Sequence, residues 1–436
     1  MFKKLGDAFK IPNLRKRIGF TFLMLIVVRL GCLLPVPGVD SSTLSALFSG
    51  NDALNFFDSI TGGSFSEMSV FALNITPYIT ASIIIQLLTI AFPKLEEMQK
   101  DGEQGRKKLN KATRYLTVGL ALFESIAMSI GFGRSGYLVK FDALHVIVVV
   151  ASLTAGSAVI MWLGEQITDK GIGNGISIVL TVNIISRIPA DLANLWSQFV
   201  AGKTVAKGIL AAVIIIAIIV AVVALVVVLQ MAERQIPMQY ASAAAGGRSP
   251  MGASKTHMPM RVNTAGVIPV IFAQSILSTP VIICTLLGKT GGTGFWGKVL
   301  KGMSQQYWFN KADWVSSIGA VVYVLLIIAF AYFYTSITFN PVEVAENLKR
   351  QRATIPGIRP GKPTSDYLTN ILNNVIMIGA LGLAIVAIIP LVFNGMFGAK
   401  VSFGGTSIII IVGVVIETLK QVESQMMVRN YKGFLD

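Results

Sequence analysis

The side chains that could do metal or nucleophilic chemistry are few in this chain of 436 residues. It holds two histidines, His145 and His257, and two cysteines, Cys32 and Cys284. The topology derived below puts the histidines on opposite sides of a membrane, so they cannot share a metal ion or form a catalytic pair. Both cysteines lie in apolar runs and suggest no disulfide framework. The sequence therefore predicts no metal, no cofactor and no enzyme.

Polar side chains inside apolar runs are the next candidates, because burying them in hydrocarbon is costly. Gln86 and Glu124 lie within two such runs. Two interpretations stay open: a packed pair that hydrogen-bonds between two helices, or a polar seam along which the helices separate. Arg29 lies near the end of the first run, where snorkelling or helix-end pairing is favoured over a direct role. The chain shows no cluster of carboxylates at mid-depth, which argues against an ion-coupled pump.

The composition identifies the class of protein whose elements carry these residues. The chain is 53% hydrophobic and 14% charged, with a mean hydropathy of +0.67, whereas soluble domains average about 25% charged residues. A span needs about 20 apolar residues to cross about 30 Å of hydrocarbon, and runs this continuous form helices rather than barrel strands. We expect ten spans, near residues 18–36, 75–92, 115–133, 144–164, 176–190, 208–231, 264–288, 314–336, 368–392 and 405–420.

Basic residues set the orientation of these spans. With the N-terminus inside, 26 of the 37 Lys and Arg residues fall in inner segments and 10 in outer ones. The sequence thus predicts that both termini are cytoplasmic and that the formal charge of +15 is concentrated on that face. Such a face suits anionic lipid or an acidic or nucleic-acid partner.

Ten spans divide into an N-terminal half, residues 1–200, and a C-terminal half, residues 201–436, with 197–208 as the hinge. An odd number of spans in each half inverts the second relative to the first. The inner loops 231–266 and 338–369 are long and basic. Loops of this length are either solvated connectors or functional segments. A third inner stretch, "GIGNGIS" at 171–177, is interpreted as a flexible start of the fifth span rather than as a phosphate loop.

The stretch from Phe56 to Phe71 is moderately apolar, but it is broken by Gly62 and Gly63. Thr76 and Pro77 signal a helix start directly after it, so the segment must turn back on itself. Such a piece is tolerated at membrane depth only inside protein or a water-filled cavity. We interpret it as a segment that blocks a passage through the protein.

Five stretches resemble the SecY family, the protein-conducting channels of the bacterial Sec translocon. They are "FALNITPYITASIIIQLL", "GEQITDKGIGNGIS", "THMPMRVNTAGVIPVIFAQSI", "IPGIRPGKPT" and "FGGTSIIIIVGVVIETLKQVESQ". The resemblance implies an all-α polytopic membrane protein whose ten transmembrane helices form two inverted five-helix halves, a clamshell around an hourglass pore. Its function would be to pass unfolded polypeptides across the membrane and to release transmembrane segments sideways through a lateral gate.

The family's functional positions fall on specific residues here. The apolar ring of the pore would be Ile75, Ile79, Ile176, Leu180, Ile271 and Ile410. The plug, residues 56–69, would include Phe56, Phe57, Gly62, Gly63, Phe65 and Met68. The lateral gate would involve Gln86, Glu124 and Gln274. Spacing alone does not identify the ring, because isoleucines four residues apart on a helix are usually core or lipid-facing surface.

The resemblance also implies partners. Arg248 and Arg359, in the two basic loops, would bind the SecA ATPase or the ribosome. Small SecE-type and SecG-type membrane subunits, signal-bearing polypeptide substrates and lipids complete the expected set, in the bacterial cytoplasmic membrane. Two other classes of function fit the sequence less well. A secondary transporter for a small solute needs a compact polar site at mid-depth, and an intramembrane enzyme needs paired catalytic groups, and the spans supply neither.

Overall fold

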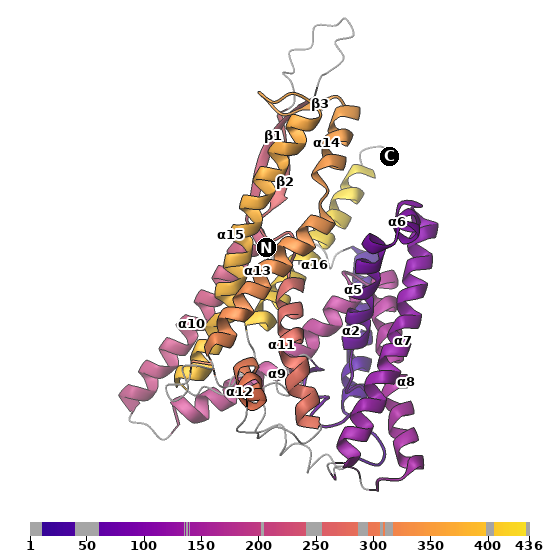
Figure 1. Ribbon diagram of the computed structural model, residues 1–436, viewed down its shortest axis with the longest axis vertical. Coiled ribbons are helices and arrows are strands. Elements are labelled where there is room, and N and C mark those ends of the chain that lie inside the picture. Colours follow the sequence, from indigo (N-terminus) through magenta and orange to yellow (C-terminus); the bar gives the residue numbers. More distant parts are fainter. Residues whose placement is uncertain are drawn as a thin grey trace, which may run out of the picture.

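A computed structural model gives the fold of the protein and describes residues 11–39, 61–134, 136, 138, 140–201, 205–240, 255–286, 295–305, 308–309, 317–397 and 405–432. Helices dominate it, and they lie in two groups that follow the order of the chain (Figure 1). Three predicted site residues lie outside the described residues: Phe56, Phe57 and Arg248.

The first group, indigo to magenta in Figure 1, comes from the N-terminal part of the chain, and its last helix, α9, extends toward the second group. Within it α7 packs on α5 and on α8, and α8 also contacts α2 and α9. Its helices are α2 (Pro12–Cys32), α5 (Thr76–Ala91), α6 (Pro93–Lys100), α7 (Glu103–Arg134), α8 (Ala143–Lys170) and α9 (Gly175–Phe199).

The second group comes from the C-terminal part and is built around the contacts α11 with α13, α13 with α15, and α10 with α16. Its core holds the fully buried Trp308, Tyr323 and Ile327. The helices are α10 (Val205–Met231), α11 (Ile268–Leu286), α12 (Phe295–Met303), α13 (Ile318–Thr338), α14 (Pro341–Arg350), α15 (Lys362–Phe397) and α16 (Gly405–Lys432).

Each of the ten predicted apolar runs coincides with one long helix of these two groups. In α10, 27 residues rich in valine and isoleucine form one helix although β-branched residues favour strands in water. Hydrocarbon reverses that preference because only a helix satisfies its own backbone groups within the segment. By length and apolar composition, six described helices are candidate spans, or seven if α5 and α6, bent by 110° at their junction, form one.

The expectation of an all-helical chain is wrong outside the apolar part, where three strands form a sheet in the order β2-β1-β3. They are β1 (Glu233–Tyr240), β2 (Lys255–Arg261) and β3 (Ala353–Thr354). Ile236 and Met238 alternate with exposed neighbours and pack on Leu348 and Leu368 of α14 and α15. This alternation of period two was the signal for a strand, and it was missed in loop 231–266. Below, the polar head means β1, β2, β3, α14 and the first turns of α15.

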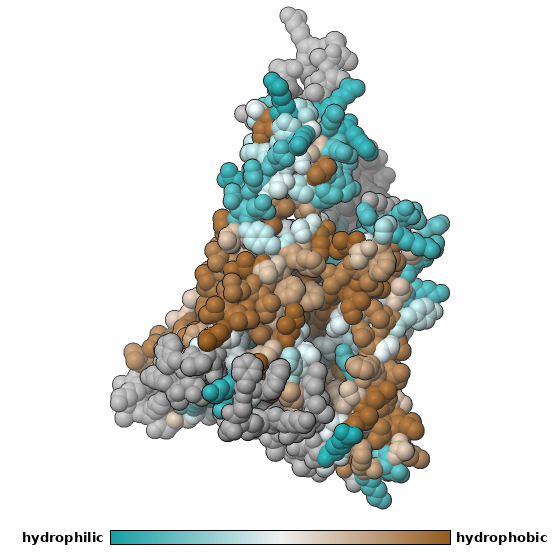
Figure 2. All heavy atoms as spheres, in the orientation of Figure 1, coloured by the Kyte–Doolittle hydropathy of each residue, from teal (hydrophilic) through white to brown (hydrophobic). Residues whose placement is uncertain are grey.

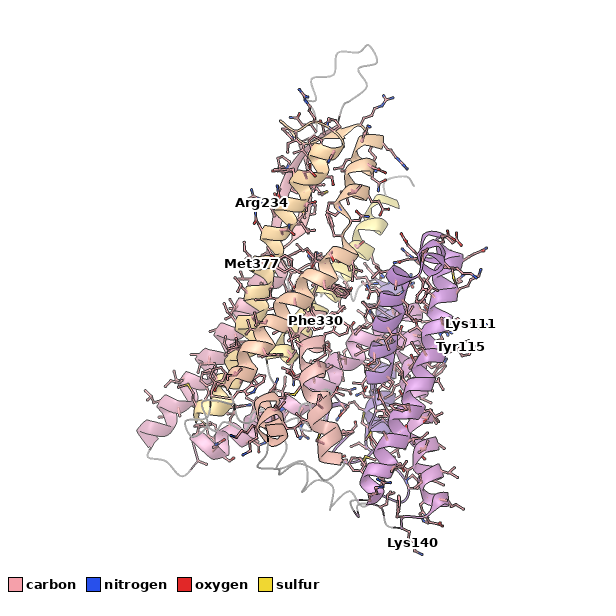
Figure 3. All side chains as sticks on the ribbon, in the orientation of Figure 1. Lys111, Tyr115, Lys140, Arg234, Phe330 and Met377 are labelled. Carbon is pink, nitrogen blue, oxygen red and sulfur yellow. The ribbon has the colours of Figure 1, made fainter. Side chains whose placement is uncertain are left out.

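The surface divides as a membrane protein requires. Figure 2 shows hydrophobic side chains in a band across the middle of the molecule, with hydrophilic side chains over the polar head and over α6. Arg234 of the polar head and Lys140, which follows α7, lie toward opposite ends of the molecule (Figure 3). The apolar band between them matches the hydrocarbon layer that the sequence demands.

Candidate functional site

All six predicted ring residues lie in one apolar cluster. Its buried members include Ile75, Leu180 and Ile410, and Ile79, Ile176 and Ile271 pack against it while remaining partly exposed. The six side chains come from four helices of both groups, α5, α9, α11 and α16. Every one of them lies at the N-cap or in the first two turns of its helix, so the starts of these four helices determine where the cluster forms.

The start of α9 is held by the "GIGNGIS" stretch, which is a tightly packed turn rather than the flexible segment we expected. Asn174 caps α9 by accepting hydrogen bonds from the backbone N–H of Ile176 and Ser177 at 3.2 and 3.4 Å. A Cβ on Gly175 would lie 2.0 Å from the carbonyl oxygen of Gly164 in α8, so only glycine fits there. The close approach of the two helices fixes the direction of Ile176 and Leu180.

The start of α5 differs in detail from the predicted helix signal. Ile75 is the N-cap residue and no side chain caps the helix, with proline in the first positions as expected. The Thr76 hydroxyl donates to the carbonyl of Leu73 instead of capping. The chain reaches this point through left-handed backbone at Met68 and Asn74, with φ of 45° and 51°. A tight turn therefore delivers Ile75 to the cluster directly from the predicted plug.

The described part of the plug, residues 61–69, is compact and enclosed by the first helix group. Its backbone pairs with the chain that leaves α2: the Val36 N–H donates to Met68 O at 2.9 Å, and the Val70 N–H donates to Leu34 O at 2.8 Å. Gly62 and Gly63 both adopt positive φ, 70° and 89°, as the predicted turn requires.

Apolar contacts complete the enclosure of the plug. Met68 is 1% exposed and packs in a cluster with α7 and α8. The ring of Phe65 lies 6.5 Å from that of Phe132 in α7, centroid to centroid. Val70 contacts both this cluster and the apolar cluster that contains the six isoleucine and leucine residues. The described residues of this segment are thus enclosed by protein and are continuous with the predicted ring positions.

Of the predicted gate residues, Gln86 joins the two helix groups. Its side-chain amide donates to the hydroxyl of Tyr334 at 3.4 Å, which links α5 to α13. No hydrogen bond joins Gln86 to Glu124 among the described side chains, so the interpretation of a bonded pair is wrong. Tyr334 was missed by sequence reasoning because one tyrosine in an apolar run resembles ordinary core or interfacial packing.

Among the described residues, neither Gln274 nor Glu124 makes a hydrogen bond between the two helix groups as Gln86 does. Gln274 is buried and stays within the C-terminal group, where its amide donates to Ser278 at 3.1 Å and its oxygen accepts a bond from Gln305. Glu124 lies on α7, half-buried. The helices that carry these two residues, α11 and α7, do touch each other across the groups.

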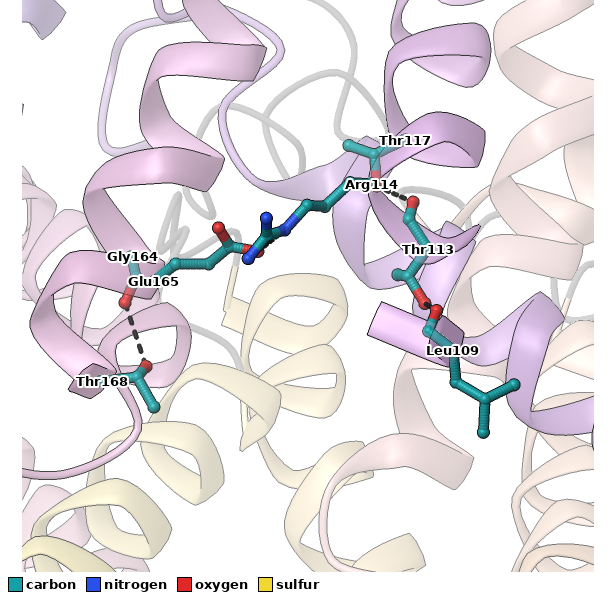
Figure 4. A network of polar contacts seen from close by, with 7 residues as sticks. All are labelled: Leu109, Thr113, Arg114, Thr117, Gly164, Glu165 and Thr168. Carbon is teal, nitrogen blue, oxygen red and sulfur yellow. Dashed lines mark hydrogen bonds and ion pairs between the residues drawn. The ribbon is translucent and has the colours of Figure 1, made fainter. Parts of the chain in front are cut away.

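An ion pair that the sequence did not reveal ties α7 to α8. The guanidinium of Arg114 donates to the carboxylate of Glu165 at 2.6 Å (Figure 4). On α7 beside it, the hydroxyls of Thr113 and Thr117 donate hydrogen bonds to backbone carbonyls of the preceding turn at 3.0 and 2.7 Å. The pair fixes the helices of the N-terminal group against each other.

The basic loop 338–369 carries Arg359 in the turn between β3 and α15 of the polar head. Its side chain is exposed, and the turn that carries it lies between Gly357 and Gly361, with φ of 82° and 102°. The Thr364 hydroxyl donates to Arg359 O at 2.8 Å and holds this turn in place. The turn therefore holds the Arg359 cation in an ordered part of the loop, and the loop is more than a solvated connector.

The described residues contain no group of three or more His, Cys, Asp or Glu side chains that could hold a metal ion. His257 lies in β2 of the polar head, and His145 lies near the start of α8, next to the segment that carries Lys140. The two cysteines are free.

Comparison with known proteins identifies the family. The SecY family profile matches residues 69–419, most of the chain. The chain belongs to the SecY family. Curated SecY relatives described as protein translocase subunits are 42% identical over 442 residues in Halalkalibacterium halodurans, over 444 in Bacillus subtilis and over 460 in Streptomyces lividans, and each alignment covers 100% of both chains.

Solved structures agree with this assignment at the level of the fold. A protein-conducting channel superposes with a TM-score of 0.67 at 17% identity, covering 94% of this chain and 92% of the other. A SecY structure concerned with the plug domain gives 0.68 at 18% identity, and canine Sec61 in a ribosome-channel complex gives 0.65 at 18%, with the same coverage. The SecY fold is thus common to this chain and to these channels.

Proposed function

We propose that this chain is the central channel subunit of a protein translocase, which passes unfolded secretory polypeptides across the bacterial cytoplasmic membrane and releases transmembrane segments into lipid. One observation carries the proposal. Ile75, Ile79, Ile176, Leu180, Ile271 and Ile410, from four helices of both groups, lie in one apolar cluster that continues into an enclosed re-entrant segment.

The architecture that goes with this function has ten transmembrane helices in two inverted halves, residues 1–200 and 201–436, which enclose an hourglass pore as a clamshell. Its support is the match of ten apolar runs to ten long helices and their division into two groups. The predicted hinge, 197–208, includes the junction at which α9 ends and α10 begins.

The ring works as a compliant seal. A constriction of branched apolar side chains dewets when it is empty, so water and ions do not pass. Side chains of a passing polypeptide displace it without breaking any specific bond. The plug, 56–69, adds a second closure from the outer side, and the partial exposure of Ile79, Ile176 and Ile271 is consistent with a ring that borders a lumen.

The lateral gate lies between α5 and α7 on one side and α11 and α13 on the other. Gln86 and Tyr334 close it with a hydrogen bond, and Glu124 and Gln274 lie on the flanking helices. A leucine at the centre of a span favours lipid by about 0.3 to 0.6 kcal/mol, and a charged residue opposes it by about 2.5 to 3.5. About six leucines thus offset one charge, and a long apolar segment leaves sideways.

The driving force must come from a partner that docks on the polar head, and we assign that role to the ribosome and the SecA ATPase. Arg359 and the basic loop 231–266, including Arg248, would contact them from the cytoplasmic side, where both termini of the chain would also lie. Two similar channels were solved on ribosomes, canine Sec61 and yeast Ssh1. SecE-type and SecG-type subunits would complete the complex.

Crosslinking tests the proposal. Single cysteines at the six ring positions, in a chain carrying Cys32→Ala and Cys284→Ala, should crosslink to a stalled, signal-bearing nascent polypeptide. The matched controls are cysteines at residues that are 43–49% exposed, one on each of the same four helices: Ile90, Ile185, Ile276 and Val415. Crosslinks from the controls as strong as those from the ring would exclude a central pore at this cluster.

A further inference from the structure

The first described turn of the plug lies against α9. Gly62 and Gly63 have positive φ, and a Cβ on Gly62 would lie 2.7 Å from the carbonyl oxygen of Asn183 and 2.9 Å from the Ser186 hydroxyl. A Cβ on Gly63 would lie 3.3 Å from the guanidinium of Arg187. The glycine pair therefore provides close contact as well as flexibility, because any larger residue would push this turn away from α9.

Polar side chains from outside the plug converge on the same turn. Arg29 of α2 donates to the Gly62 carbonyl at 3.5 Å, and Asn74 donates to the Thr61 carbonyl at 3.4 Å. Asn74 is itself held from α8, since the Ser157 hydroxyl donates to its carbonyl at 3.2 Å. Three helices, α2, α8 and α9, thus contribute to the hold on one turn.

Asn183 adds an unusual feature to this contact. Asn183 is fully buried and presents its backbone to Gly62, and among the described residues neither atom of its side-chain amide has a hydrogen-bond partner. A buried amide without a partner destabilises the arrangement that contains it. The polar hold on this turn is thus weak, because its two side-chain hydrogen bonds, at 3.5 and 3.4 Å, are long.

We propose that Arg29 and Asn183, with Arg187, form a latch that holds the plug closed through the backbone of Gly62 and Gly63 and releases it at low cost. The inference rests on the proposed function, since it needs residues 56–69 to be the plug. The three residues are positioning residues. They act on a carbonyl and on a glycine turn, so the latch does not depend on the apolar side chains of the plug.

The latch is tested in the reconstituted translocase with two measurements made without substrate: ion leak in planar bilayers, and external maleimide labelling of Ser66→Cys in the Cys32→Ala, Cys284→Ala chain. Arg29→Ala should raise both about fivefold, as expected for the loss of one hydrogen bond. Arg29→Lys should raise the ion leak and the labelling less than Arg29→Ala does. Arg134→Ala, an exposed arginine at the end of α7, is the matched control and should change neither.

A comparison of Gly62→Ala with Gly136→Ala gives a second test, which does not depend on whether the Arg29 variants fold. Gly62 and Gly136 both have positive φ, but of these two only Gly62 has neighbouring atoms within 4 Å of the place that an added Cβ would take. Gly62→Ala should raise leak and labelling, whereas Gly136→Ala bears the same backbone strain and should not.

Deleting residues 56–69 separates failure of the latch from failure of the proposed function. If the deletion raises the leak but Arg29→Ala and Gly62→Ala behave like their controls, the latch is wrong and the plug stands. Equal leak from Arg29→Ala and Arg134→Ala would also overturn the latch, since charge alone would then explain it. If the deletion leaves the leak unchanged, the assignment of the plug itself fails.

Discussion

At the scale of single residues, the proposed seal depends on the shape and apolarity of side chains rather than on any reactive group. The ring positions are isoleucines and one leucine, whose side chains exclude water and yet yield to a passing chain. A polar replacement should therefore harm the seal more than a change of apolar shape.

We expect Ile271→Asn to raise the ion leak of the resting channel about tenfold, because an amide in the ring supports a continuous water column. Planar bilayer conductance measures it. Ile271→Leu should stay near the parental value, and so should Ile276→Asn, which puts the same amide on an exposed position of the same helix. Parental conductance for Ile271→Asn would argue against Ile271 as part of the seal.

At the scale of elements, the ring is assembled by helix starts. The tight Gly164 and Gly175 contact places α9 on α8, and the plug turn places the start of α5. The two helix groups contact each other through α9 with α16 and α10, and through α7 with α11. The bond from Gln86 to Tyr334 adds a link between α5 and α13. Opening of the proposed lateral gate would have to break that bond.

A test segment needs a certain number of leucines to enter the membrane, and Tyr334→Phe should lower that number by about one. Hydrogen bonds between membrane helices contribute about 0.6 kcal/mol on average, close to the partition energy of one leucine, and a segment samples lipid only while the gate is open. A graded leucine series, scored as inserted or secreted, gives the threshold.

Tyr332→Phe is the matched control for this prediction. Its hydroxyl donates to Asn373 O at 3.1 Å, a bond inside the C-terminal group that gate opening leaves intact. An equal shift in both variants, or none in Tyr334→Phe, would remove Tyr334 from the gate.

At the scale of the whole molecule, the polar head and the apolar band separate the docking of partners from the passage of substrate. The head presents Arg359 on an ordered turn. Arg234 of the head and Lys140 lie toward opposite ends of the molecule (Figure 3). We expect cations on this surface to attract acidic groups of a partner or ribosomal RNA, with a strength that falls as salt rises.

Arg359→Glu should reduce partner-driven translocation about tenfold, because a reversed charge in a docking surface both removes an attraction and adds a repulsion. The assay is protease protection of a secreted substrate in proteoliposomes, with the amount of channel measured in parallel. Lys140→Glu reverses a charge at the opposite end and should leave transport unchanged. Normal transport by Arg359→Glu would exclude Arg359 from the docking surface.

The sequence by itself determined the membrane class and the ten apolar runs, since hydropathy and helix formation in lipid are local properties. The ring positions stay a prediction that came from the resemblance of the chain's motifs to the SecY family. The interpretation of residues 56–69 as a re-entrant plug also came from the sequence, because Gly62 and Gly63 interrupt an apolar stretch that cannot span the bilayer. These conclusions needed only residue types and their order along the chain.

Only the tertiary structure decided which distant residues meet. The bond from Gln86 to Tyr334, the pair of Arg114 and Glu165, and the turn of the plug against Asn183 join residues far apart in the chain. No pattern in one segment specifies such contacts, because side-chain contacts between helices depend on their relative rotation and depth. The sheet of the polar head was in principle predictable from its alternation, but its packing on α14 and α15 was not.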